Sequence, residues 1–80
     1  MSWRVIVIST RAKLDLQLGY MVARGERTTK VHLDEISVLL IETTQVSLTA
    51  ALLAEMMDRK IKVIFCDSKR NPSAELIPYY

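Results

Sequence analysis

The sequence contains little cysteine, histidine, glycine or proline: one cysteine, one histidine, two glycines and two prolines in 80 residues. The single cysteine, Cys66, cannot form a disulfide within the chain, which excludes a disulfide framework and points to a reducing compartment. Two glycines are too few for a glycine-rich phosphate loop, and no Walker-type, dinucleotide-binding or zinc-protease motif occurs. The composition therefore excludes the commonest nucleotide-binding and metalloprotease sites.

Long apolar runs are also missing. The longest apolar stretch without a charge lies around residues 46–54, far short of the ~20 residues that a helix needs to cross a bilayer. The residues after Met1 lead directly into a strand-like run and do not have the layout of a signal peptide. We therefore expect a cytoplasmic protein with no membrane contact.

Short segments with a two-residue period fill most of the chain, and this period is typical of β-strands. Gly19 predicts a turn or bulge between two of them. The first segment is largely apolar on both faces, which predicts a strand that is central or covered on both sides. About six short strands are predicted, at residues 3–9, 14–18, 20–24, 28–33, 36–41 and 61–66. With one helix near residues 47–59, the fold class is mainly β with one helix (α+β), a small β-sandwich-like domain.

The predicted helix at residues 47–59 is apolar around most of its girth. Ser47 or Thr44 can cap its first N–H groups, and Arg59 and Lys60 lie near its end, where cations suit the helix dipole. Apolar residues lie both on the main stripe and off it, which is typical of a helix buried on more than one side. In one small domain, the second side could belong to a partner.

The tail from Asp67 to Tyr80 differs from the rest. It begins with a basic, turn-forming stretch, and Pro72 and Pro78 bar a regular helix or a central strand. Apolar residues follow at positions 76, 77, 79 and 80. We expect such an apolar end to be a connection to further chain.

The net charge of +2 conceals a segregated pattern. Residues 1–30 carry six basic and two acidic side chains, residues 31–58 carry five acidic and no basic ones, and residues 59–70 carry five basic and one acidic. This pattern predicts one basic face, which could meet a phosphate backbone or could simply be solvated. The basic turns nominate Arg11, Lys13, Lys69 and Arg70 as candidate DNA-binding residues.

Residues that could perform catalysis are scarce. His32 is the only histidine, and on a strand it is more typical of a hydrogen-bonded residue than of a metal ligand. Asp34 and Glu35 are adjacent, so an extended chain would point them to opposite sides, and a surface turn is the better interpretation. Cys66 ends an apolar strand without a catalytic partner and is expected to be buried. We predict no catalytic residue and no metal ligand in this chain.

Five blocks of sequence, taken in order, resemble one known family. They are Trp3-Arg4-Val5, Lys13-Leu14, Val31-His32-Leu33-Asp34-Glu35-Ile36 with Leu39-Leu40-Ile41-Glu42, Val63-Ile64-Phe65-Cys66-Asp67-x-Lys69-Arg70-x-Pro72, and Leu76-x-Pro78-Tyr79-Tyr80. In this order they resemble the N-terminal domain of the first CRISPR-associated (Cas) protein, in the subtype that accompanies type II systems. The blocks span nearly the whole chain, and the last two are the most specific.

The resemblance implies that residues 1–80 form the N-terminal β-rich scaffold and dimerisation domain of a DNA integrase. Such integrases join captured foreign DNA into the CRISPR array during antiviral defence. The family has a small β-sandwich with a helix at its N-terminus and an all-helical C-terminal domain, absent from this chain, with a Glu/His/Asp site for Mg²⁺ or Mn²⁺. The resemblance therefore implies that these 80 residues alone are inactive and hold no cofactor.

The resemblance also implies partners, namely a second copy of the chain, the second Cas protein and double-stranded DNA. The loop after the first strand, here residues 10–13, approaches the end of the bound duplex in similar sequences. Lys13 matches the family there, whereas Arg11 stands where similar sequences often carry histidine. The broadly apolar helix and the last predicted strand fit a dimer interface, for which the candidates are Leu48, Leu52, Leu53, Met56, Met57 and Ile64.

Two alternatives stay open. The chain could be a free-standing small homodimeric interaction module without a nucleic-acid role. It could also be a minimal basic DNA-binding protein, although the acidic middle and the small net charge count against strong salt-dependent binding. A hydrophobic dimer tolerates salt and a DNA complex does not, so association measured across salt concentrations separates them.

Overall fold

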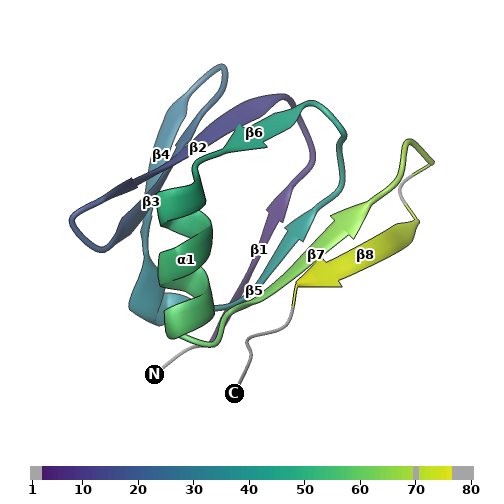
Figure 1. The fold of residues 1–80 in the computed structure, drawn as a ribbon. Helices are drawn as coiled ribbons and strands as arrows, with labels where there is room; N and C mark the ends of the chain where they lie inside the picture. The colour runs from purple at the N-terminus through teal and green to yellow at the C-terminus, as the bar shows by residue number, and fades with distance from the viewer. Residues whose placement is uncertain (1–2, 70, 77–80) are drawn as a thin grey trace.

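The computed structural model describes residues 3–69 and 71–76, which form two four-stranded sheets with one α-helix (Figure 1). Two short elements complete the fold, the 3₁₀ turn η1 (Leu33–Glu35) and the helix α1 (Ala50–Asp58). Sheet A has the order β1 (Arg4–Ile8), β5 (Ile36–Ile41), β7 (Lys62–Cys66), β8 (Pro72–Leu76), and sheet B has the order β4 (Thr28–His32), β3 (Tyr20–Arg24), β2 (Ala12–Gln17), β6 (Val46–Leu48). The predicted fold class, mainly β with one helix, is confirmed.

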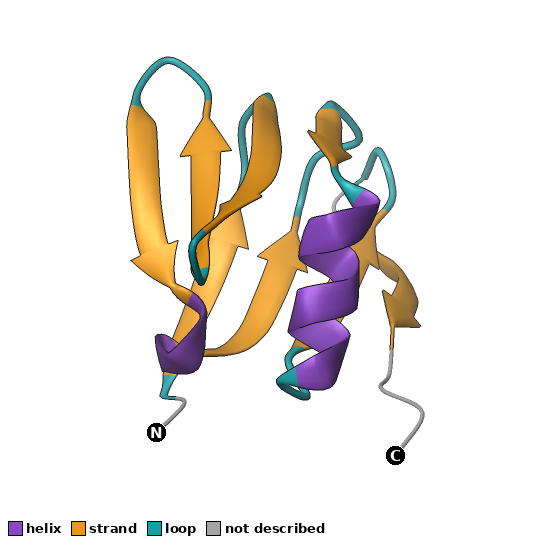
Figure 2. Cartoon of the chain, turned by 60° about the vertical axis from the view of Figure 1, so that its left-hand side comes forward, coloured by secondary structure: helices purple, strands orange, loops and turns teal. Residues whose placement is uncertain are grey.

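The order of the strands explains why two layers form. In sheet A, β1, β5 and β7 are parallel, and only β8 is antiparallel to its neighbour. Parallel neighbours need long crossover connections. The connection from β1 to β5 contains the β2–β3–β4 meander, and the one from β5 to β7 contains β6 and α1. The crossovers of sheet A therefore build sheet B and the helix (Figure 2).

The tight turn between β2 and β3 has the geometry that Gly19 predicts. Gln17 and Tyr20 are paired, and the two residues between them have positive φ angles, 48° at Leu18 and 82° at Gly19. A two-residue loop of this kind matches the right-handed twist of the strands that it joins. Glycine adopts a positive φ at little cost, whereas leucine does not. Leu18 is also 98% exposed, so it packs against nothing in the domain.

The core lies between the two sheets and extends under α1. Leu14 on β2 and Val63 on β7 are completely buried, as are Leu52 and Met56 on the helix. Burying such side chains contributes about 1.5–3 kcal/mol each before entropy is counted, so this layer dominates the stability of the fold. The buried cluster is Leu14, Met21, Val31, Leu33, Ile36, Leu39, Ile41, Leu52, Met56, Ile61 and Val63.

The structure corrects the predicted boundaries around the helix. The helix begins at Ala50 rather than at residue 47, and its N-cap is Thr49, whose side-chain oxygen accepts the N–H of Leu52 at 3.2 Å. Ser47 lies in β6 and Thr44 lies in a loop, so neither caps the helix. Ser47 and Leu48, which the helical pattern included, instead pair in parallel with β2 as part of β6.

Two further differences concern sheet A. A strand, β8, begins at Pro72, where we expected only a turn; as an edge strand it tolerates a proline at its first residue. The first strand was predicted to be central or covered, but β1 lies at the other edge of sheet A. Val5 and Val7 on β1 are 59% and 48% exposed. One face of sheet A is therefore apolar and open in the single chain.

Candidate nucleic-acid interface

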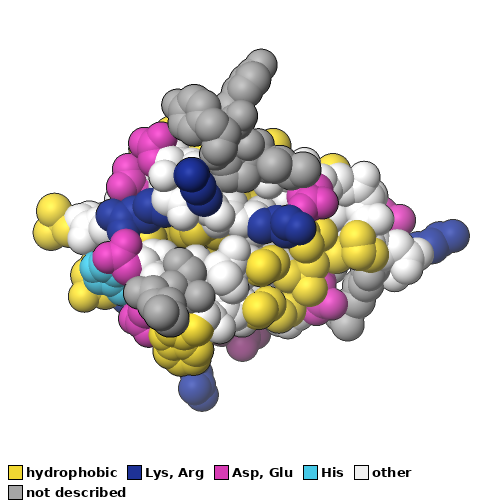
Figure 3. All heavy atoms as spheres, turned by 90° about the horizontal axis from the view of Figure 1, so that it is seen from below, with side chains coloured by type: hydrophobic (Ala, Val, Ile, Leu, Met, Phe, Trp, Pro, Cys, Tyr) yellow, Lys and Arg dark blue, Asp and Glu magenta, His cyan; other side chains and the backbone are white. Residues whose placement is uncertain are grey.

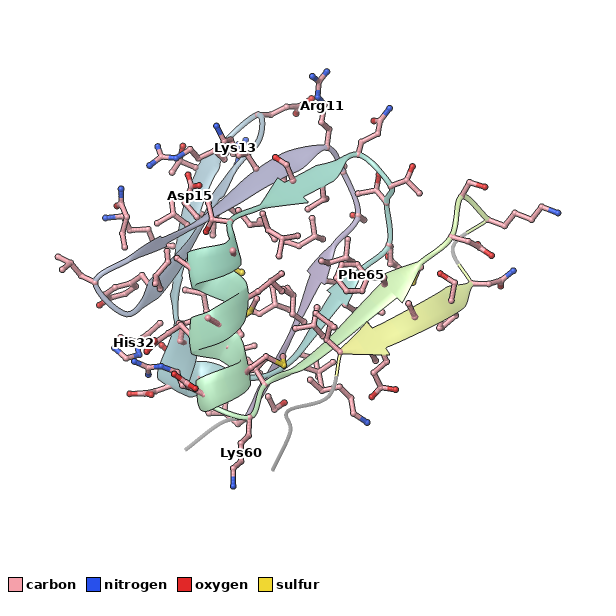
Figure 4. The ribbon with its side chains drawn as sticks, viewed as in Figure 1. Arg11, Lys13, Asp15, His32, Lys60 and Phe65 are labelled. Atoms are coloured by element: carbon pink, nitrogen blue, oxygen red, sulfur yellow. The ribbon has the colours of Figure 1, made fainter. Side chains whose placement is uncertain are left out.

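Three loops meet at one end of the domain and form a cleft of about 940 Å³, called the loop cleft here. The loops join β1 to β2, β3 to β4, and β5 to β6. Figure 4 shows the predicted residues Arg11 and Lys13 projecting at this end, whereas Lys60 projects at the opposite end. The lining residues are Thr10, Arg11, Ala12, Lys13, Arg24, Gly25, Glu26, Thr44, Gln45, Val46 and Ser47. The structure therefore brings the first predicted basic turn together with hydroxyl and amide groups of a distant loop.

The pairing of strands in sheet B brings the basic side chains of the loop cleft next to one another. Lys13 on β2 is paired with Arg24 on β3 and, on its other side, with Ser47 on β6. Directly paired residues share a face of the sheet, so these side chains form one row on the outer face of sheet B. Arg24 Nε donates to Asp15 Oδ2 at 3.1 Å, which holds the guanidinium over the neighbouring residues of the sheet.

Unpaired cations concentrate at the cleft and on the adjoining strands. Ion pairs occupy Arg4, Arg24, Arg59 and Lys62. Among the described residues, the remaining lysines and arginines form no ion pair, and they are Arg11, Lys13, Arg27, Lys30, Lys60 and Lys69. The first four of them belong to the β1–β2 loop and to the β2–β4 meander. The charge segregation of the sequence thus becomes a basic region at one end of the domain.

The opposite end is electrostatically balanced. There Arg4 pairs with Glu35, Lys62 with Glu75, and Arg59 with both Glu55 and Asp34. Figure 3, seen from below, shows side chains of both signs interspersed on this end. His32 belongs to the same region, where its Nδ1 accepts the N–H of Asp34 and its ring meets Tyr20 edge-on. His32 is thus hydrogen-bonded, as the sequence indicated, and Asp34 and Glu35 lie in the turn η1, where the sequence indicated a surface turn.

The second predicted basic turn, at Lys69 and Arg70, is only partly described. Arg70 lies outside the described residues. The carboxylate of Asp67 accepts the N–H groups of Lys69 and Asn71 at 2.8 and 3.0 Å and closes the connection between β7 and β8. A small cleft of about 220 Å³ lies between Ser68 and the β5–β6 loop. Lys69, which follows Ser68, is therefore at the same end of the domain as the loop cleft, and Glu42 lies between them.

The predicted dimer residues separate into three groups. Leu52 and Met56 are completely buried in the domain core, so they offer no surface to a partner in this structure. Leu48, Leu53 and Met57 are half-buried and pack against the same core. Ile64 alone lies on the open face of sheet A. The apolar girth of the helix is thus explained largely by the core.

The outer face of sheet A was not predicted as a surface. Its aliphatic residues are Val5, Val7, Val38, Leu40 and Ile64, none of which belongs to the core cluster. The ion-paired Lys62 and Glu75 border them, because Lys62 is paired with Val38 and Glu75 with Ile64. Register makes the set continuous, because Val5 is paired with Val38, and Leu40 is paired with both Val7 and Ile64. The signal for it was in the sequence, since strands apolar on both faces imply something on each side. A contiguous apolar patch of this kind is typical of an interaction site.

Comparison with known proteins identifies a homologue of the chain. No model of a protein family matches the sequence. The CRISPR-associated endonuclease Cas1 of Neisseria meningitidis serogroup C (strain 8013) is 32% identical over 81 residues, which is 99% of this chain. The chain is homologous to the Cas1 proteins. The resemblance inferred from the five sequence blocks is confirmed.

Solved structures show the same fold. A Cas1 protein from Thermotoga maritima matches with a TM-score of 0.85 at 10% identity, over 99% of this chain and 25% of that one. Chains of a partial Cas6-RT-Cas1–Cas2 complex and of a TtCas1–DNA complex match with TM-scores of 0.84 and 0.73, at 10% and 14% identity. These two matches cover 99% and 89% of this chain, and 24% and 28% of the solved chains. The chain spans about a quarter of the length of the Cas1 proteins that it matches.

Metal-binding side chains are not gathered in the described part of this Cas1 homologue. Within residues 3–69 and 71–76, no group of three or more His, Cys, Asp or Glu side chains could hold a metal ion. His32, Asp34, Glu35 and Glu55 are engaged with arginines or with the backbone. Cys66 is buried and free, as predicted. No helix in the described part of the chain is long and apolar enough to span a bilayer.

Proposed function

We propose that this Cas1 homologue is the N-terminal scaffold of a CRISPR adaptation integrase. The 32% identity to a Cas1 endonuclease over 99% of the chain carries the proposal. In this role the domain contributes homodimerisation, contact with Cas2 and contact with double-stranded DNA. The strand-joining chemistry belongs to the three quarters of the Cas1 length that this chain does not span. We also propose that the domain formed by residues 1–80 is cytoplasmic and that it has no integrase activity alone.

The DNA contact is supported by charge and by position. A protein that neutralises phosphates with lysine and arginine gains affinity by releasing counterions. Arg11 and Lys13 form no ion pair with any described residue, and they stand on a cleft lined by hydroxyl and amide groups that can also donate to phosphate oxygens. Lys69 adds a further cation at the same end, and we keep Arg70 with it as a prediction from the sequence.

Homodimerisation is supported by the outer face of sheet A. Its five aliphatic side chains include Ile64, which the sequence nominated for the interface. The half-buried Leu48, Leu53 and Met57 remain candidates for the interface. Leu52 and Met56 would not contact the partner and would support the interface only by stabilising the core of each subunit. A two-fold axis would place the same patch on both subunits, so every contact would occur twice.

A divalent metal is proposed for the complete protein and not for this domain. The residues described here do not provide the oxygen and nitrogen ligands that Mg²⁺ or Mn²⁺ needs. No step of the reaction is therefore assigned to this chain, whose part is to hold subunits and DNA in place.

The test compares matched charge removals. DNA affinity is measured by fluorescence anisotropy with a short labelled duplex, for the 80-residue chain and its variants Lys13→Ala and Lys60→Ala. Both lysines are exposed and form no ion pair with the residues that the structure describes, but they lie at opposite ends of the domain. We expect Lys13→Ala to weaken binding and to reduce the salt slope by about one, and Lys60→Ala to change neither. Equal effects of the two variants, or no salt-dependent binding at all, would remove the DNA role.

The alternative of a dimer module without DNA contact is favoured by the same apolar face. It predicts salt-tolerant association and no DNA binding. Strand joining with Mg²⁺ or Mn²⁺ present, assayed with this domain carried in a complete Cas1 protein and with the 80-residue chain alone, separates the two functions. Joined products from the complete protein only support the integrase proposal. A complete protein that binds no DNA supports the dimer module.

A further inference from the structure

We propose that Gly25 is a positioning residue for the loop that presents Arg11 to DNA. Because Gly25 has no side chain, the β3–β4 turn touches the backbone of the β1–β2 loop, and this contact sets the direction in which Arg11 leaves the domain. The inference rests on the proposed function, since it explains how the same basic end is held in shape.

The contact between the two loops leaves no room for a side chain. A Cβ atom added to Gly25 would stand 2.9 Å from the carbonyl oxygen of Arg11. Real Cβ atoms essentially never come within 3.0 Å of another heavy atom in this way, so this separation is repulsive. The atom met is backbone and cannot swing aside as the end of a long side chain could. Any other residue at position 25 therefore moves one loop away from the other.

The β1–β2 loop can yield only near Arg11, because its two ends are fixed. Before the loop, the carbonyl of Ile8 accepts the N–H of Glu42 at 2.8 Å. After it, the N–H of Ala12 donates to the carbonyl of Gln45 at 3.3 Å. Both bonds tie the loop to the segment that follows β5. The displacement caused by a side chain at position 25 then falls on residues 9–11.

The β3–β4 turn is also closed on itself. The N–H of Gly25 donates to the carbonyl of Arg27 at 3.1 Å, and Arg24 is paired with Thr28 across the hairpin. Moving the turn would break this bond or twist the hairpin. The loop that carries Arg11 is therefore the element that gives way.

The Arg11–Gly25 contact also forms the wall between two clefts. On one side lies the loop cleft, and on the other lies a groove of about 480 Å³ between β1 and the β3–β4 hairpin. Residues 10–12, Gly25 and Glu26 line both. A guanidinium binds phosphate through a rigid fork of donors, so its contribution depends on direction as well as on charge. Turning Arg11 toward the groove moves it away from Lys13 and Arg24, which line the loop cleft with it.

The experiment is a double-mutant cycle with DNA binding as the readout. The wild-type chain, Gly25→Ala, Arg11→Ala and the double variant are titrated with a short fluorescein-labelled DNA duplex at several salt concentrations. We expect Gly25→Ala to weaken binding severalfold and to reduce the salt slope, as Arg11→Ala does. In the double variant, the loss from Gly25→Ala should disappear, because the residue that it positions is already gone.

Gly19→Ala serves as the control. Its φ of +82° makes any side chain strained there, but the position is at the other end of the strands and does not touch Arg11. It should lower the free energy of unfolding and leave DNA affinity unchanged. Additive losses in the cycle, or wild-type affinity in Gly25→Ala beside a weakened Arg11→Ala, would overturn the positioning role. Wild-type binding by Arg11→Ala would instead remove the DNA contact of Arg11 from the proposed function.

Discussion

Val7 and Leu40 are register partners in the parallel pairing of β1 with β5, and both side chains lie on the outer face of sheet A. Leu40 is paired in turn with Ile64 of β7, so one row of aliphatic side chains crosses three strands. A lone exposed valine would need no explanation, but a row of this kind on an open sheet does. It gives the proposed homodimer a specific surface that mutation can test.

Val7→Lys is expected to weaken self-association by at least about tenfold, since a lysine must then be desolvated on both sides of a two-fold interface. Val7 is 48% exposed in the single chain, so the subunit should keep its secondary structure. Sedimentation velocity across a concentration series measures the change, and circular dichroism checks the fold. Thr28→Lys, on the exposed edge strand of sheet B, is the control and should associate like the wild type. Unchanged association of Val7→Lys would move the interface elsewhere.

Met56→Ala should destabilise the subunit by about 2–5 kcal/mol, because it leaves a cavity where the side chain is now completely buried. Met57→Ala should cost less, since Met57 is only partly buried. Urea denaturation at two protein concentrations measures both. A core residue gives the same loss at each concentration, whereas an interface residue gives a loss that depends on concentration. A loss for Met56→Ala that depends on protein concentration would show that Met56 lies in the interface.

Thr49→Ala should lower the free energy of unfolding by about 1 kcal/mol, because the Leu52 N–H loses the side-chain oxygen that caps it. Ser47→Ala is the matched comparison, since the sequence pattern nominated Ser47 as a cap and the structure places it in β6. That variant should stay within about 0.5 kcal/mol of the wild type. Chemical denaturation ranks the two, and a reversed ranking would show that the helix begins earlier.

Leu18→Asn is expected to stabilise the domain by up to about 1 kcal/mol, because asparagine accepts a positive φ more readily than leucine does. No packing is lost, since Leu18 is 98% exposed. The midpoint of thermal unfolding should rise, and the same substitution at Gln17, which has ordinary strand geometry, should not raise it. A lower midpoint for Leu18→Asn would mean that the leucine contacts something in solution.

The sequence predicted the strands that have a clear two-residue period, together with the turn at Gly19. It missed β6 because Val46, Ser47 and Leu48 fit a strand and the first turn of a helix equally well. It missed β8 because Pro72 and Glu75 have poor strand propensity; the free edge of β7 supplies the hydrogen bonds that make this segment a strand. In both cases tertiary context overrode the local pattern.

Only the part of the candidate site that consists of basic residues in one turn could be predicted from the sequence. Arg11 and Lys13 stand out as cations beside a turn, and family resemblance points to the same loop. Arg24, Gly25 and the β5–β6 loop join the site through pairings between segments distant in the sequence, such as that of Lys13 with Ser47. The spacing of apolar residues in the helix also does not show whether those side chains pack against the chain's own core or against a partner.

The parallel pairing of β1 with β5 and β7 has a consequence for folding. The β2–β3–β4 meander consists of neighbours in the sequence, so it can form as soon as it is synthesised. Sheet A cannot, because β1 must wait for a partner that begins at Ile36, and β5 must wait for one that begins at Lys62. Non-local parallel pairing is slow, so we expect closure of sheet A to limit the folding rate. β1 can pair with β5 as soon as β5 is made, but the other edge of β5 stays unpaired until β7 arrives, and the nascent chain is most prone to aggregation in that interval.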